Sequence, residues 1–310
     1  MDTTILTSIF SASIVAGTPL IIAALGELVT EKSGVLNLGL EGLMSIGAIT
    51  GFVVTNHSGS PVLGVLAAMI AGMAASLVFA IIVLNLTANQ VATGLALAIF
   101  GVGLAAFVGK PYESVALPPI EPLHIPLLSS IPVIGPALFQ QQWLVYFSWL
   151  LCAGVIWFLY RSRPGLVLRA VGESPTSAHA VGYSVLTIRY LATMFGGAMA
   201  GIGGAFMSLF YTPMWSEGMV AGRGWIALAL VVFATWRPLR VLIGAYLFGG
   251  VMIAQLFVQG SGLPIEIPSQ FLSALPYLAT VVVLVIISRN LNTIRLNSPV
   301  SLGQSFRPDA

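Results

Sequence analysis

Long apolar runs separated by short polar breaks make up most of the chain. A helix needs about 20 apolar residues to cross a bilayer, and most of the runs reach this length. They predict an all-α integral membrane protein, a helix bundle of about nine spans with interrupted helices, built as one domain over 1–310. The predicted spans are 5–26, 34–55, 62–86, 91–109, 143–160, 190–211, 219–236, 241–259 and 269–287.

The breaks between these spans differ in their content of Lys and Arg. The loops on one side of the membrane hold only Lys110 and Arg223, and the loops on the other side hold all the other Lys and Arg residues. Because loops on the cytosolic side are enriched in Lys and Arg, the N-terminus is predicted outside and the C-terminus in the cytosol. Ten of the twelve basic residues lie in the loops that this orientation assigns to the cytosol, which are 27–33, 87–90, 161–189, 237–240 and 288–310.

Composition agrees with this class and excludes others. Hydrophobic residues make up 57% and charged residues 7% of the chain, whereas soluble domains contain about 25% charged residues. The net charge of +2 is too small to indicate a nucleic-acid partner. Since Cys152 is the single cysteine, an intrachain disulfide is impossible.

The longest external segment, 109–142, is rich in proline. Proline lacks a backbone N–H and interrupts helices, so a long helix is excluded there. Two interpretations remain open: a stiff cap over the bundle, and a ledge on which an extracytoplasmic partner docks. Its prolines are Pro111, Pro118, Pro119, Pro122, Pro126, Pro132 and Pro136.

The loop 161–189 is a long polar island in the second half of the chain, with four arginines. Inside it, Ser174 and Pro175 stand before a short run that ends at Gly182. Ser is a preferred N-cap, Pro suits the first helical turn, and Gly suits the left-handed position after a helix. The pattern predicts a short capped helix over Ser174–Gly182. Such a helix between spans is suited to transmit force from a cytosolic partner.

The second predicted span begins with glycine breaks and carries Asn37 and Glu41. These residues are four apart and are therefore predicted to share a helix face. A carboxylate in lipid costs at least a few kcal/mol and usually faces a cavity or a partner. Two interpretations stay open: Glu41 lines a solute pathway, or it is hydrogen-bonded inside the bundle.

The predicted span 219–236 is irregular. Its clean apolar part, 225–236, is too short to cross a bilayer of about 30 Å. Arg223 lies near the outer boundary, where a long basic side chain reaches the headgroups. A pairing of Arg223 with Glu217 or with a substrate oxygen is the alternative.

Motifs for ATP binding, metal binding and catalysis are missing from the sequence. No lysine follows the G-x-x-x-x-G-K-[ST] pattern, and no H-E-x-x-H occurs. His57, His124 and His179 all fall in predicted loops. The sequence therefore has no set of catalytic residues that would make it a membrane enzyme. As an ion-coupled carrier, it would depend on Glu41 as its one deep ionisable group.

Four sequence blocks resemble one family of transporters. The order and spacing are similar to permease subunits of ABC importers, in the ribose/branched-chain permease superfamily and its nucleoside-type branch. The blocks are Gly26–Gly42, Thr87–Val91 followed by Gly94–Leu97, Arg169–Glu173, and Gly222–Ala229.

The resemblance implies a multi-pass subunit of the cell inner membrane that imports nucleosides, with simple sugars as the alternative cargo. ATP and Mg would bind to a separate cytosolic ATPase subunit. A second, non-identical permease chain and an extracytoplasmic solute-binding protein would complete the importer. No cofactor or metal is expected in this chain.

The resemblance also assigns residues. The coupling segment would contact the ATPase through Glu173, Ser174, Thr176, Ser177, Ala178 and Gly182. Family members often have Glu-Ala-Ala where this chain has Thr176-Ser177-Ala178, so one charged contact is missing. The candidate pathway residues are Asn37, Glu41, Asn89 and Gln90.

Overall fold

The computed structural model describes residues 3–124, 134–260 and 297–307, with isolated positions between these ranges. These residues form mainly helices, with one pair of two-residue strands. The helices are α1 (Thr3–Lys32), α2 (Leu40–Ser58), α3 (Pro61–Ala80), η1 (Ile81–Asn85), α4 (Gln90–Gly109), η2 (Lys110–Tyr112), α5 (Ile134–Phe139), α6 (Trp143–Arg161), α7 (Arg163–Glu173), α8 (Pro175–Ala180), α9 (Val185–Phe206), η3 (Met207–Tyr211), α10 (Arg223–Phe233) and α11 (Pro238–Gly260). Strands β1 (Leu123–His124) and β2 (Gln140–Gln141) pair antiparallel.

Six helical segments among the described residues are long and apolar enough to cross a membrane. Their lengths of 19 to 27 residues agree with the requirement of about 20. The prediction of a helical, multi-pass membrane protein is therefore confirmed. The predicted span 269–287 lies almost entirely outside the described residues, and the orientation of the termini stays a prediction. The six segments are Thr7–Lys32, Pro61–Asn85, Gln90–Tyr112, Trp143–Arg161, Val185–Tyr211 and Pro238–Phe257.

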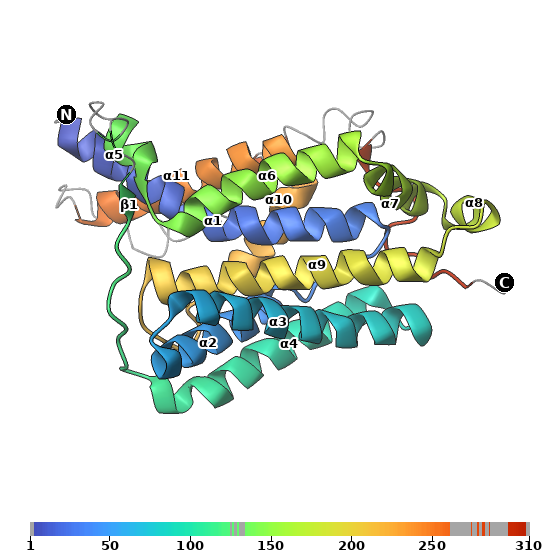
Figure 1. Cartoon of the computed structure of the whole chain (residues 1–310), viewed down its shortest axis with the longest axis horizontal. Helices are drawn as coiled ribbons and strands as arrows, with labels where there is room; N and C mark the ends of the chain where they lie inside the picture. The colour runs from blue at the N-terminus through green and yellow to red at the C-terminus, as the bar shows by residue number, and fades with distance from the viewer. Residues whose placement is uncertain are drawn as a thin grey trace.

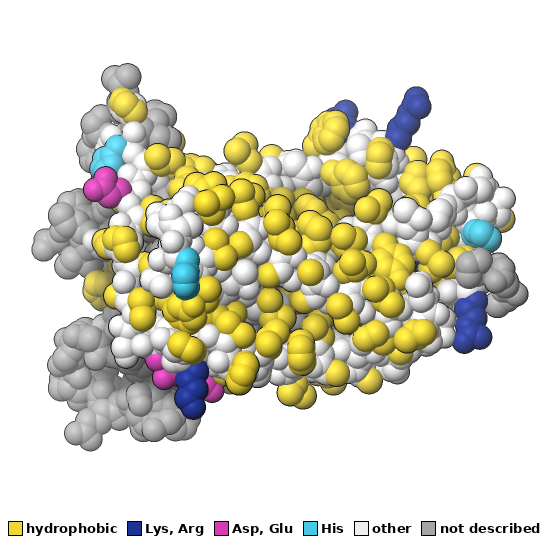
Figure 2. Space-filling view, turned by 60° about the horizontal axis from the view of Figure 1, so that its bottom comes forward, with side chains coloured by type: hydrophobic (Ala, Val, Ile, Leu, Met, Phe, Trp, Pro, Cys, Tyr) yellow, Lys and Arg dark blue, Asp and Glu magenta, His cyan; other side chains and the backbone are white. Residues whose placement is uncertain are grey.

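The long helices run side by side along the longest axis of the molecule (Figure 1). Helix α9 packs against α1, α2 and α3, while α1 also packs against α11. Figure 2 shows hydrophobic side chains over most of the visible lateral surface, with charged side chains gathered near the two ends. An apolar belt between two polar ends is the surface that a bilayer requires.

Helices α3 and α9 approach closely because small residues line their contact. A Cβ atom at Gly197 would lie 2.1 Å from the Ser76 Oγ atom, and one at Gly201 would lie 2.1 Å from the Ala68 carbonyl oxygen. Small residues permit such contacts between helices in lipid. The G-x-x-x-G pair of α9 thus packs within this chain.

The chain between α1 and α2 differs from the prediction. Helix α1 continues to Lys32, so the predicted loop 27–33 is almost wholly helical, and α2 begins only at Leu40. The prediction that Asn37 and Glu41 share a helix face is therefore wrong. Side chains hold the intervening backbone out of a helix: Gln90 Oε1 accepts a hydrogen bond from Leu36 N at 2.8 Å.

The predicted span 219–236 is helical only as α10, and residues 212–222 before it are irregular. The outer part of this segment lies against the proline-rich loop. Leu117 N donates to the Pro213 carbonyl oxygen at 2.8 Å, and Ala116 pairs with Met214. The described part of the loop is thus fixed to the bundle, as expected for a stiff cap, and its role as a docking ledge stays a prediction.

Candidate functional site

Helix α8 is the short capped helix that the sequence predicts. Ser174 Oγ accepts a hydrogen bond from Ser177 N at 3.3 Å. At the other end, Gly182 has a φ of 97°, which favours glycine. Helix α7 before it was not predicted, although Ser162 and Pro164 give the same start signal. Ser162 Oγ accepts a hydrogen bond from Gly165 N at 3.0 Å.

The two sides of α8 have different surroundings. Ala178 is buried in a small apolar cluster with Val171, Val185 and Phe306. The opposite side and the following turn are exposed, and Val181 is 77% exposed. Figure 1 shows α8 at the far end of the bundle, beside the C-terminal segment. Of the predicted coupling residues, Glu173, Thr176, Ser177 and Gly182 are exposed, Ser174 is half-buried, and Ala178 faces the bundle.

Residues 297–307, the C-terminal strap, tie the coupling segment to the rest of this end. Ser301 N donates to the Gly172 carbonyl oxygen at 3.0 Å, and Gly303 N donates to the Gly34 carbonyl oxygen at 3.1 Å. Phe306 supplies one side of the cluster around Ala178. The strap therefore bonds both to α7 and to the turn before α2.

Arg189, at the start of α9, lies beneath this strap and is fully buried. Its three nitrogens donate to the Ser33 carbonyl oxygen at 3.2 Å, to the Gln304 carbonyl oxygen at 3.0 Å and to Ser301 Oγ at 3.2 Å. A buried cation is costly unless its donors are bonded. The sequence interpretation counted Arg189 only as a basic loop residue and missed this role.

The second part of the site is the junction at which Glu41 joins the start of α2 to the start of α10. It lies in the first turn of α2, and its carboxylate accepts hydrogen bonds from Gly222 N and Gly224 N, both at 2.7 Å. These N–H groups belong to the start of α10, where the helix dipole favours negative charge. A Cβ atom at Gly224 would lie 2.5 Å from the Glu41 Cα atom. Glycine at 224 is therefore required for the close approach.

A cavity of about 90 Å3 lies next to this junction. Glu41 and Ser45 provide its polar side, and residues of α4 and of the 212–222 segment close it. Pockets that enclose a small-molecule ligand measure about 300–1,000 Å3. The cavity is therefore too small to enclose a nucleoside or a sugar in this conformation.

The other candidate pathway residues make local structural bonds. Asn37 is buried, and its Oδ1 atom accepts from Gly39 N at 2.9 Å. Gln90 is buried against the turn before α2, and Asn89 caps α4 by accepting from Ala92 N at 3.0 Å. The structure brings Asn37 and Gln90 to one turn, while Glu41 lies at the α10 junction.

More ionisable groups are buried than the sequence interpretation expected. Glu41 was expected to be the one deep ionisable residue, but Glu27, Glu31 and Arg189 are also buried. Glu31 accepts a hydrogen bond from Trp236 Nε1 at 2.5 Å. The loop predicted at 27–33 hid Glu27 and Glu31, because α1 continues through it.

Arg223 makes contacts within its own segment, while its place at the headgroups and its pairing with a substrate oxygen stay predictions. Its Nη1 atom donates to the Met219 carbonyl oxygen at 2.7 Å, and its guanidinium lies over the Tyr211 ring at 5.3 Å. The side chain therefore stabilises the irregular segment that leads into α10.

Helix α4 leaves a broad apolar face without a partner among the described residues. It packs mainly on α2 and lies at one edge of the bundle (Figure 1). Its outer face carries Leu95, Ile99, Phe100, Leu104 and Phe107, all of them exposed.

Comparison with known proteins identifies the family. Residues 9–288 match the family described as branched-chain amino acid transport system/permease component. The chain belongs to this family.

Curated relatives cover almost the whole chain. A putative glucose ABC transporter permease of Haloferax volcanii is 40% identical over 96% of this chain and 97% of its own length. A guanosine ABC transporter permease of Bacillus subtilis is 35% identical, with 90% and 92% covered. A nucleoside ABC transporter permease of Lactococcus lactis is 33% identical, with 87% and 89% covered. The chain is thus a permease subunit of an ABC transporter.

Two of these organisms contain a second similar permease. One from Haloferax volcanii is named for glucose and one from Bacillus subtilis for guanosine. Each is 24% identical to this chain, and each match covers 81% of this chain. In both organisms, two permeases that differ in their identity to this chain are therefore named for the same solute.

Proposed function

We propose that this chain is one half of the membrane pathway of an ATP-driven importer in the cell inner membrane, with nucleosides as cargo. A cytosolic ATPase subunit binds ATP and Mg and hydrolyses the ATP. An extracytoplasmic solute-binding protein delivers the solute, and the whole chain, 1–310, acts as a single permease domain. The family membership and the relatives named for guanosine and nucleosides support this proposal.

The observation that carries the proposal is the exposed side of α8. A helix of six residues with its own cap, packed on the bundle through Ala178, presents its other side at the end of the molecule. Exposed Val181 and Tyr183 give that side an apolar surface next to polar residues. This is a small, firmly held surface on which an ATPase subunit can dock.

A second, unlike permease chain is proposed to cover the face of α4. That face is apolar and exposed, and it borders the cavity next to Glu41. Two chains that meet there would enclose a pathway between them, with the Glu41 junction close to its wall. The paired relatives in two organisms support an unlike partner.

Glucose is the second candidate cargo, because the relative that is 40% identical is named for it. Nucleosides and sugars both present hydroxyl groups, which suit a weakly polar pathway. Uptake of labelled guanosine and of labelled glucose by the reconstituted importer, each competed by the other, decides between them. Uptake that continues without ATP and stops when the proton gradient is dissipated would instead indicate an ion-coupled carrier.

Substitution Val181→Glu tests the docking surface. It places a charge in the exposed turn directly after α8 and should lower coupled uptake about tenfold, which corresponds to a loss of about 1.4 kcal/mol at the contact. The matched control is Val181→Thr, which keeps the size of the side chain at the same exposed position but adds no charge. Equal uptake by both variants and by the unchanged protein would contradict the role of α8.

Cysteine labelling tests the proposed orientation. In a Cys152→Ser background, single cysteines replace Ser129 in the proline-rich loop or Ser177 in α8. An impermeant thiol reagent applied to intact cells should label position 129 and not position 177. The opposite pattern would reverse the orientation and remove α8 from the cytosol.

A further inference from the structure

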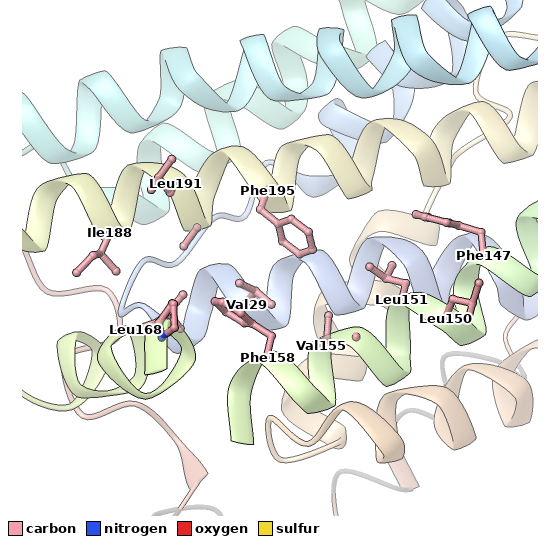
Figure 3. A pocket seen from close by; sticks show the side chains of 13 residues that line it. Val29, Phe147, Leu150, Leu151, Val155, Phe158, Leu168, Ile188, Leu191 and Phe195 are labelled. Carbon is pink, nitrogen blue, oxygen red and sulfur yellow. The ribbon is translucent and has the colours of Figure 1, made fainter. Parts of the chain in front are cut away.

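An apolar groove runs along the outside of the bundle between α6 and α9, with α1 behind it (Figure 3). Its volume is about 670 Å3. Exposed Leu150 on α6 and Leu191 on α9 form its two rims, at 72% and 63% exposure. The floor consists of buried apolar side chains, which are Val29, Val155, Leu168 and Ala192.

The groove has the length of one bilayer leaflet. Phe147 and Phe158 mark its extent along α6, and at about 1.5 Å per residue they lie about 16 Å apart along the helix. The hydrocarbon core of a bilayer is about 30 Å thick, so one leaflet contributes about half of that. A groove of this length on a membrane-facing surface matches an extended acyl chain.

One end of the groove is positively charged. Gly154 and Phe158 line it on α6, and Arg161 follows three residues later on the same helix face. Pro164 of α7 also lines the groove, and Arg163 directly precedes it. Both arginines are exposed, and neither side chain forms a hydrogen bond or ion pair with any residue that the structure describes. Tyr160 and Trp157, also exposed, are residues typical of the membrane interface.

We propose that this groove binds one anionic phospholipid, with an acyl chain between α6 and α9 and the headgroup phosphate at Arg161 and Arg163. Arginine pairs well with phosphate oxygens because its planar guanidinium can donate two parallel hydrogen bonds. Basic pockets between membrane helices on the cytoplasmic side are a recognised type of lipid headgroup site. The orientation proposed above puts the arginines at the cytoplasmic leaflet.

Other occupants fit the groove less well. All thirteen lining residues are apolar or glycine, so a nucleoside or sugar would lose the hydrogen bonds of its hydroxyl groups there. A second permease chain is better placed on α4, at the opposite edge of the bundle from α6 (Figure 1). An apolar protein helix would also leave the two arginines without an anion.

Gly154 allows a direct test by filling the groove. A Cβ atom there meets no atom within 4 Å, so Gly154→Leu adds bulk to the groove without displacing the fold. The full-length permease, purified in mild detergent, is analysed for bound phospholipid by mass spectrometry. We expect a single phospholipid, mainly phosphatidylglycerol or cardiolipin, in the unchanged protein and in Gly154→Ala. Gly154→Leu should retain severalfold less, with an unchanged gel-filtration profile.

Arg161 and Arg163 provide a second test of the proposed lipid site. In vesicles of phosphatidylglycerol and phosphatidylcholine, Arg161→Gln with Arg163→Gln should keep a bound lipid but lose the preference for phosphatidylglycerol. Unchanged lipid content in Gly154→Leu would overturn the site, and an unchanged preference in the double variant would overturn the headgroup assignment. A changed subunit stoichiometry in Gly154→Leu would show that a protein occupies the groove. The binding measurement needs no transport, so its failure leaves the proposed function untouched.

Discussion

The two short helices α8 and α10 are both capped at their N-termini, but the caps come from different places. Ser174, the residue before α8, caps it through its own hydroxyl. Helix α10 is held by Glu41, which belongs to α2 and lies far away in the sequence. Helix α8 is exposed on one side, whereas Gly224 at the start of α10 is buried against Glu41. The start of α8 is thus fixed by a residue next to it in the sequence, while the start of α10 depends on a second helix for its position.

The largest effect is expected from Glu41→Leu. It removes both acceptors at the start of α10 and leaves the N–H groups of Gly222 and Gly224 unpaired. A buried donor left without an acceptor costs about 1–3 kcal/mol. The thermal unfolding midpoint in detergent and the uptake rate should fall together. A variant that loses uptake at unchanged stability would show that Glu41 acts in the pathway alone.

Glu41→Gln tests whether the charge of Glu41 or its hydrogen-bond acceptors hold the start of α10. Its amide oxygen can accept one of the two hydrogen bonds, but its NH2 group would face the other N–H donor. Stability and uptake should therefore lie between those of the unchanged protein and of Glu41→Leu. Equal losses in both variants would mean that the charge of Glu41, and not its capacity to accept hydrogen bonds, fixes α10.

A smaller effect on global stability is expected from Ala178→Asp. The carboxylate would enter the cluster of Val171, Val185 and Phe306, where burying an unpaired polar group costs about 1–3 kcal/mol. Helix α8 should detach while the membrane helices stay folded, so uptake falls more than the unfolding midpoint does. Ala180→Asp is the matched control for detachment, because Ala180 lies on the exposed side of the same helix and Asp there should leave hydrogen exchange of the α8 amides unchanged. Equal hydrogen exchange of the α8 amides in the two variants would contradict the observed packing of α8.

The smallest effect is expected from Ser174→Ala. Loss of an N-cap side chain costs about 1 kcal/mol, and the effect should stay within α8. Hydrogen exchange of the α8 amides should become about fivefold faster, while exchange in α9 is unchanged. Ser184→Ala is the control, since Ser184 precedes α9 without bonding a backbone N–H of that helix. Faster exchange throughout the bundle would show that α8 is not a local unit.

Local signals account for the features that could be predicted. Ser174, Pro175 and Gly182 are close in sequence, so the cap, the first turn and the end of α8 could be predicted together. The apolar runs likewise predicted the long helices, because the length of each run can be read from consecutive residues alone. Helix α7 had a similar start signal, but the polar character of 161–189 led to a loop prediction.

Contacts between distant residues account for what was missed. The partners of Glu41 lie in the glycine segment before α10, and no local pattern links the two. Arg189 looked like a loop residue because its acceptors come from the turn before α2 and from the C-terminal strap. Glu27 and Glu31 were placed in a loop since charge normally ends a span, yet they are buried within α1.

The C-terminal strap has a consequence for the order in which the protein is made. The ribosome synthesises the turn at 33–39 early and residues 297–307 long afterwards, but the two are bonded in the finished molecule. Until the strap emerges, the Arg189 guanidinium lacks two of its three acceptors. A prematurely terminated chain would therefore leave the Arg189 guanidinium with unpaired donors at the end of the bundle that carries α8.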